Sequence, residues 1–278
     1  MKLEIGCDVK RTLYVLRAVP AWIVMALALG AGAVVGSGAA AQQPTPAPAP
    51  PAPRAAAPID LTGYWVSVVT EDWRFRMLTP PKGDYASMPI NAAGRKAADA
   101  WDPAKAATDG CKAFGAAGVM RQPGRLHVTW ENDTTLKIET DAGQQTRLLR
   151  FDKPQTPGVE RTWQGQSAAE WEFGPGRGGG PAAGRGQAPA RVGSLKVITT
   201  NLRSGYLRKN GVPHSENAVV TEYVDRFAVD GTEWLTVLTN VEDPQYLTQP
   251  FITSTHFKRE PDGSKWTPMP CEASARPR

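Results

Sequence analysis

The chain has 278 residues, of which 41% are hydrophobic and 21% charged, and its formal net charge is +5. The charge falls to about +3 without residues 1–41, which carry four basic and two acidic residues. So mild an excess argues against a dedicated nucleic-acid binder, which usually presents a clustered basic face.

Residues 1–41 are predicted to form a signal peptide. Lys10, Arg11 and Arg17 supply its positive start, the run after them is uncharged, and it ends in three alanines that suit signal peptidase. The alternative is an uncleaved inner-membrane anchor through residues 18–41, because about 20 apolar residues can span a bilayer. We expect a periplasmic or secreted protein, with membrane contact only through such an anchor.

A tract of proline and alanine follows at residues 42–59. Alternating prolines favour extended polyproline II chain and offer no large apolar side chain for packing. We therefore expect a disordered spacer before one folded domain at residues 60–274. That domain has about 215 residues, which is long enough for a well-buried core.

Short β-type runs separated by turn dipeptides such as Asp230-Gly231 dominate the sequence from Asp60 onward. They are rich in valine, isoleucine, threonine and aromatic residues, as half-buried strands require. The clearest runs are residues 61–70, 125–131, 134–140, 144–151, 168–173, 194–202, 217–228, 233–241 and 251–259. The pattern predicts a mostly β fold, a single antiparallel up-and-down barrel of about 8–10 strands, because closure removes exposed strand edges.

The alanine-rich residues 91–107 interrupt this pattern. Asn91 is suited to be an N-cap, so we expect one helix from there to about Trp101 and a short second turn after Pro103. These one or two short helices would cap one end of the barrel.

Cys111 and Cys271 are the two cysteines outside the predicted signal peptide. An even pair in an exported chain most simply forms one disulfide, which would stabilise the fold by roughly 5 kcal/mol in the chain-entropy model. A reactive thiol pair is the alternative, although the two cysteines do not form a C-x-x-C arrangement.

Residues 174–193 are rich in glycine, proline and arginine and are expected to form a flexible loop. Their G-x-G-x-x-G pattern lacks the flanking strand and helix of a dinucleotide site. Export also disfavours the RNA-binding interpretation of their RGG-like composition. We therefore expect no cofactor and no nucleic-acid partner.

Three features in chain order resemble the lipocalins and the wider calycin group: Gly63-Tyr64-Trp65, Thr221-Glu222-Tyr223, and Arg259 at the end of the last predicted strand. The resemblance implies a lipocalin-like barrel in which Arg259 stacks on Trp65 and closes one end through a cation–π contact. Residues 60–272 are also similar to a family of uncharacterised exported bacterial proteins, through segments such as VVTEDWRFRM and STHFKREPDGSKW. That second likeness implies a location and a barrel but no reaction.

The densest polar and aromatic run is residues 70–76. As a strand, it would place Asp72, Arg74 and Arg76 on one face and Trp73 on the other. Two arginines on one face can recognise a carboxylate or phosphate, because the guanidinium fork matches those groups. A solvated strand face with weak local ion pairs is the alternative.

His256 on the last predicted strand and Glu222 on a preceding one are the candidate catalytic residues. A histidine–carboxylate pair inside a barrel can act as general base and acid, because histidine titrates near neutrality. A single hydrogen-bonded structural histidine is the alternative. The three histidines share no spacing typical of metal ligands, so we expect no metal site.

Tryptophans after residue 41 either fill the barrel or line a cavity for a planar or apolar ligand. The leading hypothesis is a binding protein for a small, partly apolar molecule. One alternative is an enzyme on the same barrel that performs acid–base isomerisation, hydration or cyclisation; another is a cell-envelope protein-interaction module. The oligomeric state stays open. The expected ligand-binding residues are Trp73, Arg74, Arg76, Tyr206, Glu222 and His256.

Overall fold

A computed structural model describes residues 49–105, 110–153, 156, 158–173 and 193–271. The predicted signal peptide and nearly all of the predicted loop at 174–193 lie outside the described residues. The Pro/Ala tract is described from residue 49, and it contains a short helix, α1 (Pro53–Ala56). The Trp171 indole donates a hydrogen bond to the Pro53 carbonyl at 2.8 Å, so this part of the tract contacts the barrel.

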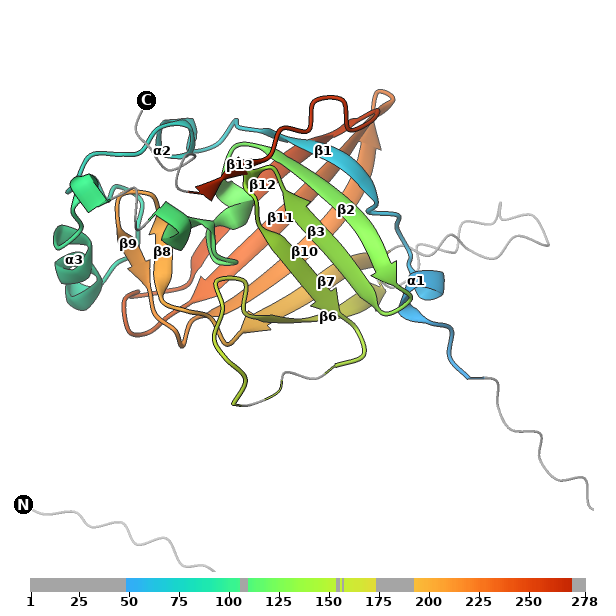
Figure 1. Ribbon diagram of the computed structural model, residues 1–278, viewed down its shortest axis with the longest axis horizontal. Helices are drawn as coiled ribbons and strands as arrows, with labels where there is room; N and C mark the ends of the chain where they lie inside the picture. Colours follow the sequence, from blue (N-terminus) through green and yellow to red (C-terminus); the bar gives the residue numbers. More distant parts are fainter. Residues whose placement is uncertain (1–48, 106–109, 154–155, 157, 174–192, 272–278) are drawn as a thin grey trace, which may run out of the picture. The chain divides into compact units, whose positions relative to one another are not determined.

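Nine strands form a closed barrel in the described part of the chain, which confirms the predicted β-barrel (Figure 1). Their order around the barrel is β1-β12-β11-β10-β7-β6-β5-β3-β2. The strands are β1 (Gly63–Val68), β2 (Arg125–Asn132), β3 (Thr135–Thr140), β5 (Thr146–Arg150), β6 (Gln166–Phe173), β7 (Gly193–Thr200), β10 (Val219–Val229), β11 (Thr232–Glu242) and β12 (Phe251–Glu260).

The predicted purely antiparallel arrangement is wrong at one junction. β5 and β6 pair in parallel, with Leu149 opposite Ser167. A parallel neighbour needs a connection that returns to the starting end of the previous strand, whereas a tight hairpin gives an antiparallel pair. The connection between Arg150 and Gln166 makes this return, so the barrel is mixed.

The remaining elements lie mostly at one end of the barrel, next to α2 (Trp73–Met77) and α3 (Ala92–Asp99) (Figure 1). The predicted helix at 91–101 is confirmed: the Asn91 side chain accepts a hydrogen bond from the Gly94 amide at 2.9 Å, as an N-cap does. The other elements are β8 (Gly205–Arg208), β9 (Val212–His214), β4 (Ala142–Gly143), β13 (Met269–Pro270), and the 3₁₀ turns η1 (Pro103–Lys105), η2 (Gly110–Phe114) and η3 (Val119–Arg121).

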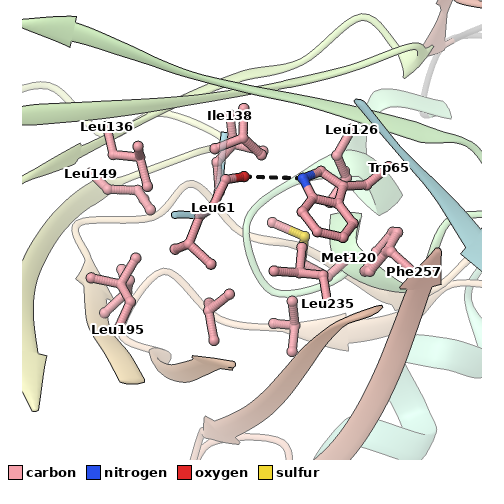
Figure 2. Packing of buried hydrophobic residues seen from close by; sticks show 14 of the residues in the cluster. Leu61, Trp65, Met120, Leu126, Leu136, Ile138, Leu149, Leu195, Leu235 and Phe257 are labelled. Atoms are coloured by element: carbon pink, nitrogen blue, oxygen red, sulfur yellow. Dashed lines mark hydrogen bonds between the residues drawn. The ribbon is translucent and has the colours of Figure 1, made fainter. Parts of the chain in front are cut away.

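Apolar side chains from every side of the barrel fill its interior (Figure 2). They include Trp65, Leu136, Leu195 and Phe257, which alternate along their strands with outward-facing residues. Met120 of η3 enters from the capped end and packs in the same cluster. The indole of Trp65 donates a hydrogen bond to the Leu61 carbonyl at 3.0 Å, so its one polar group is satisfied.

A tryptophan and an arginine lie together at the opposite end of the barrel. The Arg259 guanidinium is 5.3 Å from the Trp65 ring centroid, and the Glu233 carboxylate pairs with it at 3.1 Å. Gly63 has a φ of 119°, and a Cβ there would lie 3.0 Å from an Arg259 guanidinium nitrogen. A glycine at this position therefore allows the arginine to approach the strand.

Cys111 and Cys271 form a disulfide, as predicted, with their Cα atoms 4.9 Å apart. The bond joins η2 to the end of the described chain, where β13 pairs in parallel with β4. Both cysteines pack with Phe114, which is fully buried. The disulfide therefore fixes the C-terminal segment across the rim of the barrel.

Replacing both cysteines by serine is expected to reduce the free energy of unfolding by about 2–5 kcal/mol, because the bond links residues 160 positions apart and restricts the unfolded chain. Urea unfolding measures the change. The reduced wild-type protein should unfold at the midpoint of the double variant, and reductant should not alter the variant. Equal midpoints for the oxidised wild type and the variant would contradict this prediction.

Candidate functional site

The predicted ligand residues Trp73, Arg74 and Arg76 lie on a helix, so the strand expected there is wrong. β1 ends at Val68, and α2 begins after Asp72, whose φ of 50° turns the chain into a left-handed conformation. Helical spacing separates side chains that a strand would place together. Arg76 is buried, whereas Arg74 and Trp73 are exposed, Trp73 at 61%.

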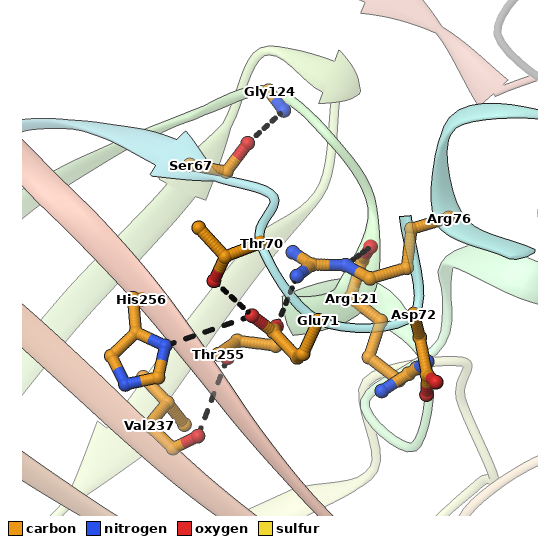
Figure 3. Close-up of polar contacts among 10 residues, drawn as sticks. All are labelled: Ser67, Thr70, Glu71, Asp72, Arg76, Arg121, Gly124, Val237, Thr255 and His256. Atoms are coloured by element: carbon orange, nitrogen blue, oxygen red, sulfur yellow. Dashed lines mark hydrogen bonds and ion pairs between the residues drawn. The ribbon is translucent and has the colours of Figure 1, made fainter. Parts of the chain in front are cut away.

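Glu71 is the centre of a group of polar side chains at the rim, which we call the Glu71 cluster: Thr70, Glu71, Arg76 and His256. Figure 3 shows its carboxylate between the His256 ring and the Arg76 guanidinium. The Thr70 hydroxyl donates to Glu71 at 2.9 Å, and the His256 Nδ1 lies 3.8 Å from the same carboxylate. The structure thus brings together two predicted residues, Arg76 and His256, around a carboxylate that the sequence analysis had not selected.

A second ion pair, between Arg121 and Asp72, lies next to the Glu71 cluster and close to the start of β12. Arg121 donates to the Asp72 carboxylate at 2.9 Å, and its guanidinium lies 5.6 Å from the Phe251 ring centroid. The Arg76 Nε donates to the Arg121 carbonyl at 3.0 Å, which links the two ion pairs (Figure 3). Burial lowers the pKa of Arg76, and the nearby Arg121 cation adds to this effect while Glu71 opposes it.

Arg208 of β8 is a third buried arginine in the same region. Its guanidinium carbon lies 4.0 Å from the Phe75 ring centroid, and its Nη1 donates to the Ala86 carbonyl at 2.8 Å. Burial and the neighbouring Arg121 cation lower the pKa of Arg208 to about 10. The partly buried Asp84 pairs instead with Arg74 at 2.6 Å.

An open groove of about 640 Å³ lies beside the two ion pairs, and we call it the rim groove. Its lining combines the carboxylates of Glu71 and Asp72 with apolar side chains and the hydroxyls of the first residues of β12. The lining residues are Glu71, Asp72, Ser87, Met88, Pro89, Arg121, Gln249, Pro250, Phe251, Ile252, Thr253 and Ser254. His256 is two residues from this lining and contacts it through Glu71.

Glu222 lies inside the barrel and forms a buried ion pair with Arg147. The two Arg147 terminal nitrogens donate to the Glu222 oxygens at 3.0 and 2.6 Å, and one also contacts the Thr199 hydroxyl at 3.3 Å. Ser167 and Thr199 share a further hydrogen bond of 2.8 Å. These residues form a polar layer inside the barrel.

The structure does not bring Glu222 and His256 together. Thr239 of β11 is opposite Glu222 on one side and opposite Thr253 of β12 on the other. Residues paired across strands share a face, and His256 is three positions after Thr253, so it faces outward. His256 therefore has Glu71 as its carboxylate neighbour, not Glu222.

Tyr206 is also apart from the rim groove. It lies in β8 and packs against the apolar cluster that contains Phe114 and the Cys111–Cys271 disulfide. The Lys112 Nζ lies 5.5 Å from its ring centroid. His214 lies buried in β9, where its Nδ1 is 3.0 Å from the Ser215 carbonyl. Burial lowers the pKa of His214, which favours its neutral form.

Sequence reasoning missed Arg121, Arg147 and Arg208. Arg147 carried a usable signal, because it is two residues before the buried Leu149 on the same strand and must share its face. Arg121 lies in a 3₁₀ turn outside any periodic segment, so nothing in the pattern placed it. Within the described residues, no group of three histidines, cysteines or acids is arranged to hold a metal ion.

Comparison with protein-family models, curated proteins and solved structures gives no match for this chain. The resemblance to lipocalins and to exported bacterial proteins therefore stays a prediction beyond the barrel itself. None of the described helices is long and apolar enough to cross a membrane.

Removing one partner of the Arg147–Glu222 pair is expected to lower the free energy of unfolding by about 3–5 kcal/mol, because the other charge stays buried without compensation. Arg147→Met and Glu222→Leu test this singly, and the double variant should regain most of the loss. Urea unfolding of the four proteins gives the coupling energy. Losses that simply add in the double variant would show that the two side chains do not depend on each other.

Proposed function

We propose that the protein is an exported binding protein whose small, partly apolar ligand lies in the rim groove and not inside the barrel. The observation that carries this proposal is the groove itself, which is about 640 Å³ in volume. Two of its lining residues, Glu71 and Asp72, are carboxylates held in ion pairs with arginines. Ligand sites are typically concave, with an apolar lining and a few well-placed polar groups.

The filled interior supports a site at the rim. Leu136, Leu195 and Phe257 from different strands meet inside the barrel, and Met120 packs among them from the capped end. Small barrels either fill with side chains or hold one ligand. This barrel belongs to the first kind over its described residues, so its ligand would need another concave surface.

The lining indicates the class of ligand. Glu71 and Asp72 direct carboxylates to the groove, each held by a buried arginine, Arg76 or Arg121. Pro250 and Ile252 add apolar surface, with Ile252 61% exposed. A molecule with an amine or hydroxyl donor at one end and an apolar body at the other matches this pattern. Because the carboxylates are already oriented, binding would cost little side-chain entropy.

The disulfide is compatible with an oxidising compartment and hence with the predicted export. The enzyme alternative lacks the His256–Glu222 pair on which it was based, because Glu222 is buried in an ion pair with Arg147. An interaction surface is the second candidate, carried by Trp73, Met77 and Leu78, which are all more than half exposed on and beside α2.

Mass spectrometry of small molecules that co-purify with the exported protein tests the proposal. We expect one compound, or a narrow chemical class, to accompany the wild-type protein. Ile252→Arg should reduce its amount at least about tenfold, because the longer charged side chain would occupy the groove and compete with the ligand for its carboxylates. Tenfold corresponds to about 1.4 kcal/mol of binding free energy.

Val229→Arg is the matched control, since it places the same side chain at an exposed apolar position in the β10–β11 turn region, outside the groove lining. It should retain the compound. Equal loss in both variants, or no compound in the wild type, would contradict binding in the rim groove. Cross-linking to a protein that disappears in Trp73→Ser would instead support the interaction surface.

A further inference from the structure

Three buried arginines converge on one small cavity near the rim. Arg76, Arg121 and Arg208 expose only 2%, 7% and 3% of their surfaces. All three line a cavity of about 10 Å³, together with Phe75, Gln122, Leu207 and Lys209. The cavity is distinct from the rim groove, with which it shares only Arg121.

Donor groups of these arginines lack partners. The Arg76 Nη2 and the Arg208 Nε and Nη2 are buried and donate to no protein atom. A buried donor without an acceptor destabilises the fold, and more strongly when it is charged. Three such groups in two side chains that line the same cavity indicate that an acceptor belongs there.

The charges around the cavity do not balance. Arg76 pairs with Glu71 and Arg121 pairs with Asp72, while Arg208 contacts the neutral Ala86 carbonyl and the Phe75 ring. No carboxylate among the described residues forms an ion pair with Arg208. Arg208 thus carries a buried positive charge with no carboxylate in direct contact, and Asp72 and Asp84 stabilise that charge only from a longer distance.

The size of the cavity limits what can occupy it. The cavity volume of about 10 Å³ is small and gives room for one small occupant. A single small occupant therefore suits it better than phosphate, sulfate or a carboxylate-bearing metabolite. A water molecule would satisfy donors but leave the charge uncompensated, whereas a monatomic anion would do both.

We propose that this cavity is a structural anion site that binds a chloride ion between Arg76, Arg121 and Arg208. The bound anion would accept hydrogen bonds from the unpartnered guanidinium nitrogens and compensate the charge of Arg208. It would also link β8, α2 and η3, because each of these elements supplies one of the arginines. This site is independent of the ligand proposed for the rim groove.

Thermal unfolding of the full chain in sodium chloride tests the site, with sodium fluoride at equal ionic strength as the reference, because fluoride retains its hydration shell more strongly. We expect Tm to rise with chloride and to saturate after about 3–5 °C. Arg208→Met should abolish the chloride-specific rise in Tm. The methionine side chain can still pack on Phe75, so the variant tests the loss of the charge and of the donors. Arg203→Met, at an exposed arginine on the Trp163 ring, should retain the rise.

Bromide provides a direct readout that does not depend on any variant. Crystals of the wild-type protein soaked in sodium bromide should show an anomalous peak between the three guanidinium groups. A water molecule at that position, or Tm values that are equal in chloride and fluoride, would overturn the proposal. An unchanged chloride response in a folded Arg208→Met variant would overturn it as well.

Discussion

The contact between Arg76 and its two partners organises the rim on which the rest of the site depends. Its guanidinium pairs with Glu71 in the chain just after β1 and donates to the Arg121 carbonyl in η3. Charge-assisted hydrogen bonds are about twice as strong as neutral ones, and burial strengthens them further. One side chain thereby joins α2, the chain after β1, and the turn that carries Met120 into the barrel.

This junction explains why the filled barrel and the open groove occur together. η3 directs Met120 inward, where it packs among the core side chains, and directs Arg121 toward Asp72 at the rim. The turn that closes the barrel end therefore also fixes a carboxylate of the groove. Inside the barrel, the Arg147–Glu222 pair separates an apolar cluster that contains Val224 from one that contains Val220.

The barrel was predictable because its signals are local and periodic. Strand alternation and the Asn91 cap can be recognised within a few residues. The disulfide could be predicted because only two cysteines are available outside the predicted signal peptide. The segment at 70–77 was not predictable in the same way. Its alternating charges and aromatics suit a strand, but the left-handed Asp72 and the buried partners of Arg76 select a helix. Those partners include the Arg121 carbonyl, 45 residues away, which no local pattern reveals.

The predicted pairing of His256 with Glu222 is wrong for a related reason. Alternation correctly divides each strand into two faces, but it does not say which face of β12 matches which face of β10. The register through Thr239 decides this, and it places the two side chains on opposite sides of the sheet. A shift by one residue in either pairing would have put both on the same face of the sheet. Chemistry that depends on two strands therefore depends on their register, whereas the Glu71 cluster depends on a turn and a buried arginine.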